Sequence, residues 1–167
     1  ALLLTAVEGF TVADTAVIPS RPSDQIEGEI AAARAEIAAM LKSRILIIED
    51  EPLIAMHIEA IVEDMGHETV GIATTHREAV ALGSEASPDL ILADIQLADG
   101  SSGIDAVKDL LKDFHVPVIF ITAYPERLLT GERPEPTWLV TKPFEADTVV
   151  ATIGQALLQH QPQIVTV

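Results

Sequence analysis

Short apolar runs alternate with helix-length amphipathic segments from residue 45 to about residue 159, and this alternation constrains the fold more than any other feature. The runs are ILIIE, TVGIA, LILAD, PVIFIT and WLVT, and the amphipathic segments cover 51–65, 75–86, 102–114 and 145–159. Strands that are apolar on both faces and joined by helices are typical of a parallel sheet covered on both sides. We therefore expect an open, doubly wound α/β structure with five strands.

Polar side chains follow four of these runs, at the edge where such sheets bind ligands. The first strand ends in Glu49 and Asp50, and the third ends in Asp94. Thr122 ends the fourth strand and Lys142 follows the fifth. Two carboxylates about 4 Å apart repel by roughly 4 kcal/mol at an effective dielectric of about 20, so a cation is expected among them. Mg²⁺, which prefers oxygen ligands, fits such a group of carboxylates.

Charge and composition exclude several classes of function. The chain has 10 basic and 26 acidic residues, a net charge of −16, and such a surface repels nucleic acid and anionic membranes. The absence of cysteine excludes disulfides and thiol catalysis and suits the cytoplasm. The apolar runs are shorter than the roughly 20 residues that span a bilayer, and the segment ALLLTAVEGF lacks the basic residues of a signal peptide. We expect a cytoplasmic protein that binds neither DNA nor membranes.

The motifs at the strand ends stand in the order found in one family. The acidic pair, LILADIQLADGSSGID, VIFITA and TKPF resemble the receiver domains of two-component response regulators over Ile45 to about Gln159. The resemblance implies a flavodoxin-like sheet in which Asp94 accepts a phosphoryl group from a histidine kinase. Lys142 would neutralise the developing charge, and the Thr122 hydroxyl would bond the phosphoryl group after transfer.

The same resemblance implies the ligands of Mg²⁺. Asp50, Asp94 and the backbone carbonyl of Gln96 would bind the ion directly, and Glu49 would bind it through water. Haloacid-dehalogenase-like phosphatases also form an aspartyl phosphate, but they place a second Asp where this chain has Gln96. The protein is therefore expected not to be an enzyme, apart from accepting a phosphoryl group and losing it again. Gln96 and Tyr124 are expected to tune how long that group survives.

One segment departs from the common receiver pattern. Between Thr122 and Lys142 the chain reads AYPERLLTGERPEPTW, whose prolines and glycine forbid the usual long helix. The position three residues before Lys142 holds Leu139 instead of an aromatic residue, and Trp138 lies one residue earlier. A mechanism with a rotating aromatic ring is therefore not expected. Trp138 is interpreted either as a partly exposed aromatic residue or as a contact for a partner.

Residues 1–44 are expected to form a separate helical lobe. They read as two short helices and a longer one, IEGEIAAARAEIAAMLK, and resemble the second lobe of an extracytoplasmic-function sigma factor, a helix-turn-helix unit. This segment has four basic and six acidic residues, a net charge of −2, and the presumptive reading helix begins SDQIEGE. Reading DNA requires cations that the helix lacks. The segment has the pattern of a sigma lobe without its electrostatics.

A sigma-like lobe placed before a receiver resembles the PhyR-type anti-anti-sigma response regulators of the general stress response. The resemblance implies that phosphorylation frees the lobe from the receiver so that it captures an anti-sigma factor of the NepR type. Family members carry two sigma-like lobes, and this chain begins inside the second. We expect the lobe at 1–44, the receiver at 45–160 and a C-terminal tail at 161–167. The alternatives are a DNA-binding transcriptional regulator and a stand-alone receiver that acts as a phosphate sink.

Overall fold

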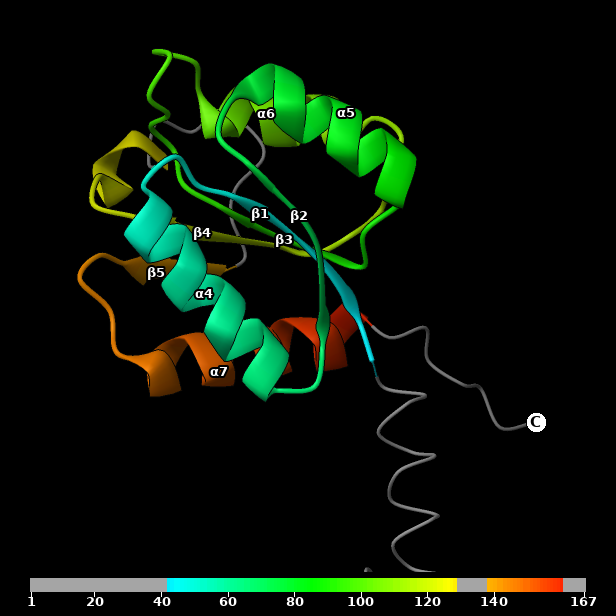
Figure 1. The fold of residues 1–167 in the computed structure, drawn as a ribbon, viewed down its shortest axis with the longest axis vertical. Helices are drawn as coiled ribbons and strands as arrows, with labels where there is room; N and C mark the ends of the chain where they lie inside the picture. The colour runs from blue at the N-terminus through cyan, green and yellow to red at the C-terminus, as the bar shows by residue number, and fades with distance from the viewer. Residues whose placement is uncertain (1–41, 129–137, 161–167) are drawn as a thin grey trace, which may run out of the picture. The chain divides into compact units, whose positions relative to one another are not determined.

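The computed structural model describes residues 42–128 and 138–160 (Figure 1). The chain divides into two compact units, residues 1–42 and 43–167, and the fold below is that of the second unit. The expected sigma-like lobe and the tail at 161–167 lie outside the described residues. In the part of the chain that is described, no helix combines the length and the apolar character needed to cross a membrane.

The second unit is built on one parallel sheet of five strands in the order β2-β1-β3-β4-β5. The strands are β1 (Arg44–Ile48), β2 (Glu68–Ala73), β3 (Leu90–Ala93), β4 (Val118–Thr122) and β5 (Trp138–Thr141). The expected doubly wound sheet is confirmed. Strand order reverses direction between β1 and β3, which is where ligands bind in sheets of this kind.

Helices cover both faces of the sheet (Figure 1). They are α4 (Pro52–Asp64), α5 (His76–Ala86), α6 (Gly103–Leu110) and α7 (Ala146–His160). Alternate residues of β1 face opposite layers: Leu46 and Ile48 pack in the layer beneath α5 and α6, whereas Ile45 and Ile47 pack in the layer beneath α4 and α7. The central strands are apolar along most of their length, from Ile45 to Ile48 in β1, throughout β3 and from Val118 to Ile121 in β4, because both of their faces are buried.

The helix after β3 is shorter than expected, and the segment after β4 forms a short helix of a different kind. The helix expected over 102–114 ends at Leu110, because the N–H groups of Lys112 and Asp113 bond carbonyls three residues back, in tighter turns than an α-helix makes. After β4 the chain forms the short 3₁₀ helix η1 (Pro125–Leu128). The rest of the segment, residues 129–137, lies outside the described residues.

Candidate functional site

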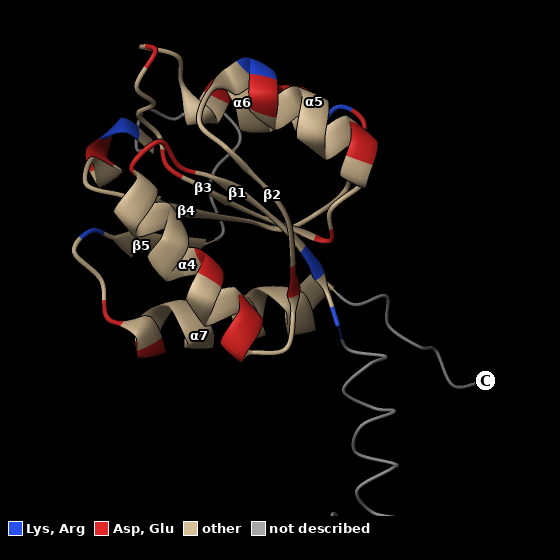
Figure 2. Cartoon of the chain, viewed as in Figure 1, with Lys and Arg blue, Asp and Glu red and all other residues tan. Residues whose placement is uncertain are grey.

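The carboxyl ends of β1, β3 and β5 bring the predicted polar residues to one pocket. Figure 2 shows acidic residues in red along the loop between β1 and α4, beside this edge. Asp94 directly follows β3, and its N–H donates to the carbonyl of Ile48 at 2.8 Å, which fixes the start of its loop. The pocket has a volume of about 340 Å³. Its lining residues are Asp50, Glu51, Asp94, Gln96, Leu97, Ala98, Ala123, Tyr124 and Lys142.

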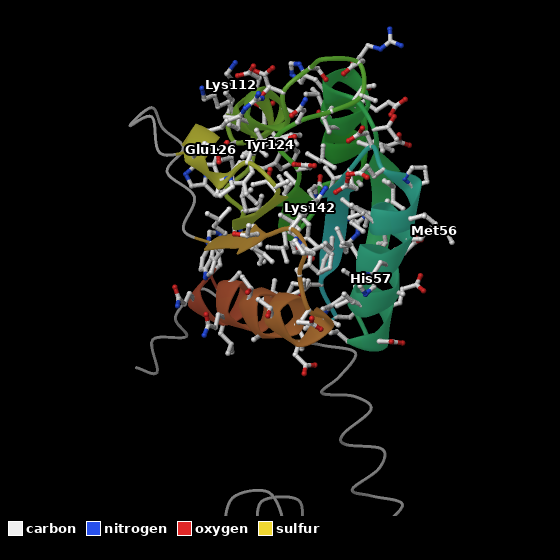
Figure 3. All side chains as sticks on the ribbon, turned by 90° about the vertical axis from the view of Figure 1, so that its left-hand side faces the viewer. Met56, His57, Lys112, Tyr124, Glu126 and Lys142 are labelled. Carbon is white, nitrogen blue, oxygen red and sulfur yellow. The ribbon has the colours of Figure 1, made fainter. Side chains whose placement is uncertain are left out.

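Lys142 is the cation of this pocket (Figure 3). Its Nζ lies 2.7 Å from Asp94 Oδ2 and 2.7 Å from Glu49 Oε2, and its side chain is 9% exposed. Burial alone would lower the pKa of Lys142, but its close contacts with the Asp94 and Glu49 carboxylates outweigh burial and leave that pKa above its ordinary value. The ammonium group therefore remains charged and pairs with two carboxylates.

Glu49 is the most deeply buried carboxylate of the site, with 1% of its surface exposed. Its Oε1 accepts a hydrogen bond from the Glu51 N–H at 3.2 Å. Its Oε2 is buried without a well-directed hydrogen bond and meets only the Lys142 ammonium group as an ion pair. Burial raises the pKa of Glu49, although Lys142 opposes that rise. Glu49 thus has an oxygen with unused capacity to bond a cation or water.

The geometry fits a divalent cation. Among the described residues, Glu49, Asp50 and Asp94 each offer a carboxylate oxygen, and these oxygens lie within 4.8 Å of one another. A single ammonium group cannot neutralise three carboxylates, and the buried oxygen of Glu49 has no directed donor. A hard cation with several oxygen ligands and bound waters, such as Mg²⁺, satisfies both conditions. Gln96 lines the same pocket.

Asp94 is held at both oxygens. Oδ2 pairs with Lys142, and Oδ1 accepts the N–H of Ile95 at 2.5 Å and, more weakly, the N–H of Gln96 at 3.4 Å. Gly103, the first residue of α6, packs so closely on the Asp94 backbone carbonyl that a methyl group at position 103 would overlap it. The backbone of Asp94 therefore keeps its place only if position 103 has no side chain.

Thr122 does not line the pocket but directly precedes two residues that do. Its side chain is fully buried, and its hydroxyl oxygen accepts the N–H of Tyr124 at 3.2 Å. Its backbone carbonyl accepts the N–H of Lys142 at 2.9 Å. Ala123 and Tyr124 line the pocket, whereas Thr122 does not. In this state the hydroxyl oxygen accepts a bond from the nearby backbone.

Aromatic contacts fix the loops on either side of the pocket. The ring of His57 on α4 stacks on Phe144, two residues after Lys142, with centroids 5.4 Å apart (Figure 3 labels His57). The Arg127 guanidinium lies 5.4 Å from the centre of the exposed Tyr124 ring. Trp138 is half-buried and packs against the core beneath α4 and α7, so part of its surface belongs to the core.

Five of the seven predicted site residues thus line one pocket, namely Asp50, Asp94, Gln96, Tyr124 and Lys142. Glu49 and Thr122 do not line it, but Glu49 contacts it through its ion pair with Lys142. Sequence reasoning missed two residues of this site, Glu51 and Gly103. The sequence shows Glu51 as the third consecutive carboxylate after the first strand. It does not show that this carboxylate lies near Lys142, which only the structure reveals. A glycine at the start of a helix has no signal in sequence that distinguishes close packing from a cap.

Comparison with protein families gives two adjoining matches. Residues 45–154 match the family described as the response regulator receiver domain, and residues 1–39 match the sigma-like domain of the response regulator PhyR. The chain is 57% identical over 162 residues to the phyllosphere-induced regulator PhyR of Methylorubrum extorquens. That alignment covers 96% of this chain, and the chain spans 61% of the length of that relative.

Solved structures give the same result. The solution structure of the PhyR receiver domain from Erythrobacter litoralis is 61% identical, with a TM-score of 0.70, and the match covers 76% of this chain and 99% of that one. The crystal structure of the anti-anti-sigma factor PhyR in complex with the anti-sigma factor NepR from Bartonella quintana is 53% identical, with a TM-score of 0.62. That match covers 95% of this chain and 65% of the other.

Proposed function

Because the chain belongs to the PhyR family of response regulators, in which a sigma-like domain is joined to a receiver domain, we propose that its receiver is a phosphorylation switch. Asp94 accepts the phosphoryl group, and Lys142 holds charge beside it. The observation that carries this proposal is the contact of Lys142 Nζ with Asp94 Oδ2 at 2.7 Å, inside a pocket that also contains the carboxylates of the β1 end. A weak carboxylate nucleophile needs such neutralising charge before an anionic phosphoryl group can approach.

In this proposal Mg²⁺ is held by Asp50, Asp94 and the Gln96 carbonyl directly, and by Glu49 through water. When bound, the ion would screen the charge between the carboxylates and the phosphoryl oxygens. Lys142 screens charge on the other side of Asp94. Gln96 and Tyr124, which line the mouth of the pocket, tune how readily water reaches the phosphoryl group and hence its rate of autodephosphorylation.

Thr122 supplies the conformational switch. After transfer its hydroxyl leaves the Tyr124 N–H and bonds a phosphoryl oxygen, which pulls the loop that follows β4 toward Asp94. The backbones of Thr122 and Lys142 are joined, because the Thr122 carbonyl accepts the backbone N–H of Lys142. A small movement at the phosphoryl group is thereby passed to the segment between β4 and β5.

A histidine kinase is the proposed phosphoryl donor. Leu53 and Met56 are 82% and 63% exposed on α4, which begins directly after Glu51 at the pocket (Figure 3 labels Met56). Large exposed apolar side chains beside a reactive site favour contact with a protein over a small molecule. A donor protein placed over the pocket would cover these two side chains.

The proposed output is capture of an anti-sigma factor of the NepR type. We assign residues 1–44 to the sigma-like lobe, 45–160 to the receiver and 161–167 to a C-terminal tail. Phosphorylation releases the lobe from an intramolecular contact with the receiver. The match of residues 1–39 to the PhyR sigma-like domain and the similarity to a PhyR bound to NepR support this assignment. The net charge of −16 argues against DNA and membranes as partners and suits a cytoplasmic protein.

Mapping the phosphoryl group tests the proposal. The chain is incubated with Mg²⁺ and either acetyl phosphate or phosphoramidate, and the modified residue is located by mass spectrometry. We expect one label, on Asp94, and none in Asp94→Ala. Asp99→Ala, which removes another carboxylate from the loop after β3, serves as the matched control and should be labelled normally. Undiminished labelling of Asp94→Ala would refute the assignment.

A further inference from the structure

Glu51 occupies the mouth of the pocket and has no role in the proposal above. It lines the pocket with Asp50 and Asp94, and its side chain is 63% exposed. Its Oε1 lies 3.7 Å from Lys142 Nζ, against 2.7 Å for each of the two buried partners of that ammonium group. Glu51 is therefore close enough to influence charge in the pocket but too far out to be a main partner of Lys142.

The backbone of Glu51 is fixed independently of its side chain. Its N–H donates to Glu49 Oε1 at 3.2 Å, and its carbonyl accepts the N–H of Ala55 at 2.9 Å in the first turn of α4. The carboxylate is not part of the group of oxygens that could hold a metal, which among the described residues comprises Glu49, Asp50 and Asp94. Replacing the side chain should therefore change charge at the mouth and leave the backbone in place.

A phosphoryl donor must approach Asp94 past this carboxylate. Two unit charges about 6 Å apart in water repel by roughly 0.5 to 1 kcal/mol before salt screening, and the repulsion scales with the charge of the donor. Among the described residues that line the pocket, Lys142 is the one cation, and Glu51 competes with an incoming anion for it. The cost therefore falls most heavily on small donors with two negative charges.

We propose that Glu51 determines donor specificity by disfavouring small dianionic phosphodonors relative to less highly charged ones. This inference rests on the proposed function of the pocket and adds a residue to it. In the transfer, an Asp94 carboxylate oxygen forms a bond to phosphorus while the bond from phosphorus to the leaving atom breaks. The electron pair of the broken bond stays with the leaving group, which is acetate from acetyl phosphate and ammonia from phosphoramidate. A protein donor offsets the same repulsion through its own contacts with the surface.

The test compares two donors of different charge at pH 7. Acetyl phosphate is chiefly a dianion and phosphoramidate chiefly a monoanion, so Glu51→Gln should accelerate labelling by acetyl phosphate about threefold and labelling by phosphoramidate less than twofold at physiological salt. Both rates are measured by mass spectrometry at saturating Mg²⁺, because the substitution also alters attraction for the ion. The selective gain should shrink at high salt as the charge is screened.

Glu63→Gln is the matched control. Glu63 is an exposed glutamate near the far end of α4. At a rise of 1.5 Å per residue it lies about 18 Å along the helix from Glu51. That distance is more than twice the Debye length of about 8 Å at physiological salt. Its substitution should leave both rates unchanged.

Several outcomes would overturn the inference or its premise, and they can be told apart. If Glu51→Gln changes both rates by the same factor, or if its effect does not depend on salt concentration, Glu51 acts through the structure of the loop and the inference is wrong. If the unsubstituted chain is not labelled on Asp94 by either donor, the proposed function itself fails. A Glu51→Asp variant keeps the charge and should retain the ratio of the two rates found in the unsubstituted chain.

Discussion

Replacing Lys142 by Met should destabilise the receiver, because it leaves buried carboxylates without their cation. The ammonium group lies 2.7 Å from both Glu49 and Asp94. One such pair amounts to roughly 6 kcal/mol of Coulomb attraction at an effective dielectric of about 20, before the cost of desolvating the ammonium group. Removing one partner of a buried pair costs about 3–5 kcal/mol overall. We expect a loss of about 3 kcal/mol, since Glu49 can take up a proton in response.

The loss should depend on pH and on Mg²⁺. Burial already raises the pKa of Glu49, and removing Lys142 removes an opposing effect, so that pKa rises further. The unpaired carboxylate is therefore protonated at low pH and ionised at high pH, and Lys142→Met should lose more stability at pH 8 than at pH 5. Without the competing ammonium group, Mg²⁺ should bind roughly tenfold more tightly, and excess Mg²⁺ should restore part of the lost stability.

Urea unfolding followed by far-ultraviolet circular dichroism, in EDTA and in excess Mg²⁺, measures these effects. Lys112→Met is the matched control, because Lys112 makes an equally short pair, 2.6 Å to Asp109, with an exposed side chain (Figure 3). Its free energy of unfolding should change little, since exposed ion pairs contribute little. Equal losses in the two variants, or a Lys142→Met loss that Mg²⁺ does not reduce, would refute the reasoning.

Three further predictions follow from the same structure. In Mg²⁺ titrations by calorimetry, Asp50→Ala should weaken binding more than Glu49→Ala, because only the first removes a proposed direct ligand, and equal losses would contradict the ligand assignment. Gly103→Ala should slow phosphorylation and lower stability by at least about 2 kcal/mol, because its methyl group meets a backbone carbonyl, whereas Gly154→Ala, in open space on α7, should be neutral or stabilising. Burial lowers the pKa of His67, whose Nδ1 accepts a backbone N–H, so stability should fall as pH drops below about 6.5. His67→Asn is a non-titrating control, because Asn keeps an acceptor and does not ionise; it should lose that part of the pH dependence, and an unchanged profile would exclude His67 as its source.

The sheet and the site residues at the ends of its strands could be predicted because both follow from short-range patterns. Ile45 to Ile48 are buried on both faces, and such strands have no polar position until they reach the edge. The topology then places Asp50, Asp94 and Lys142 at the same edge, whatever the details of packing. The acidic pair was therefore visible in sequence as a site before its geometry was known.

Other features depend on contacts that the sequence does not specify. Leu111 and Phe114 continue the apolar pattern of α6 and pack against the core, so periodicity extends past Leu110, where the helix ends. The pKa of Glu49 reflects a balance between burial and an ion pair with Lys142, and that balance requires distances. The hydroxyl of Thr122 bonds the nearby backbone in this state, which no motif indicates.

The most direct test of the proposed switch is the affinity for a NepR-type anti-sigma factor of a protein that carries both sigma-like lobes before this receiver, with and without a phosphoryl group on Asp94. We expect tighter binding after phosphorylation, by up to about 150-fold if phosphorylation biases the switch by about 3 kcal/mol. Asp94→Ala should bind equally before and after treatment with the phosphodonor, and promoter DNA should not bind in either state at low salt. Equal affinity for the anti-sigma factor in both states, in a chain shown by mass spectrometry to carry the phosphoryl group, would contradict the proposal that the receiver controls the sigma-like lobe.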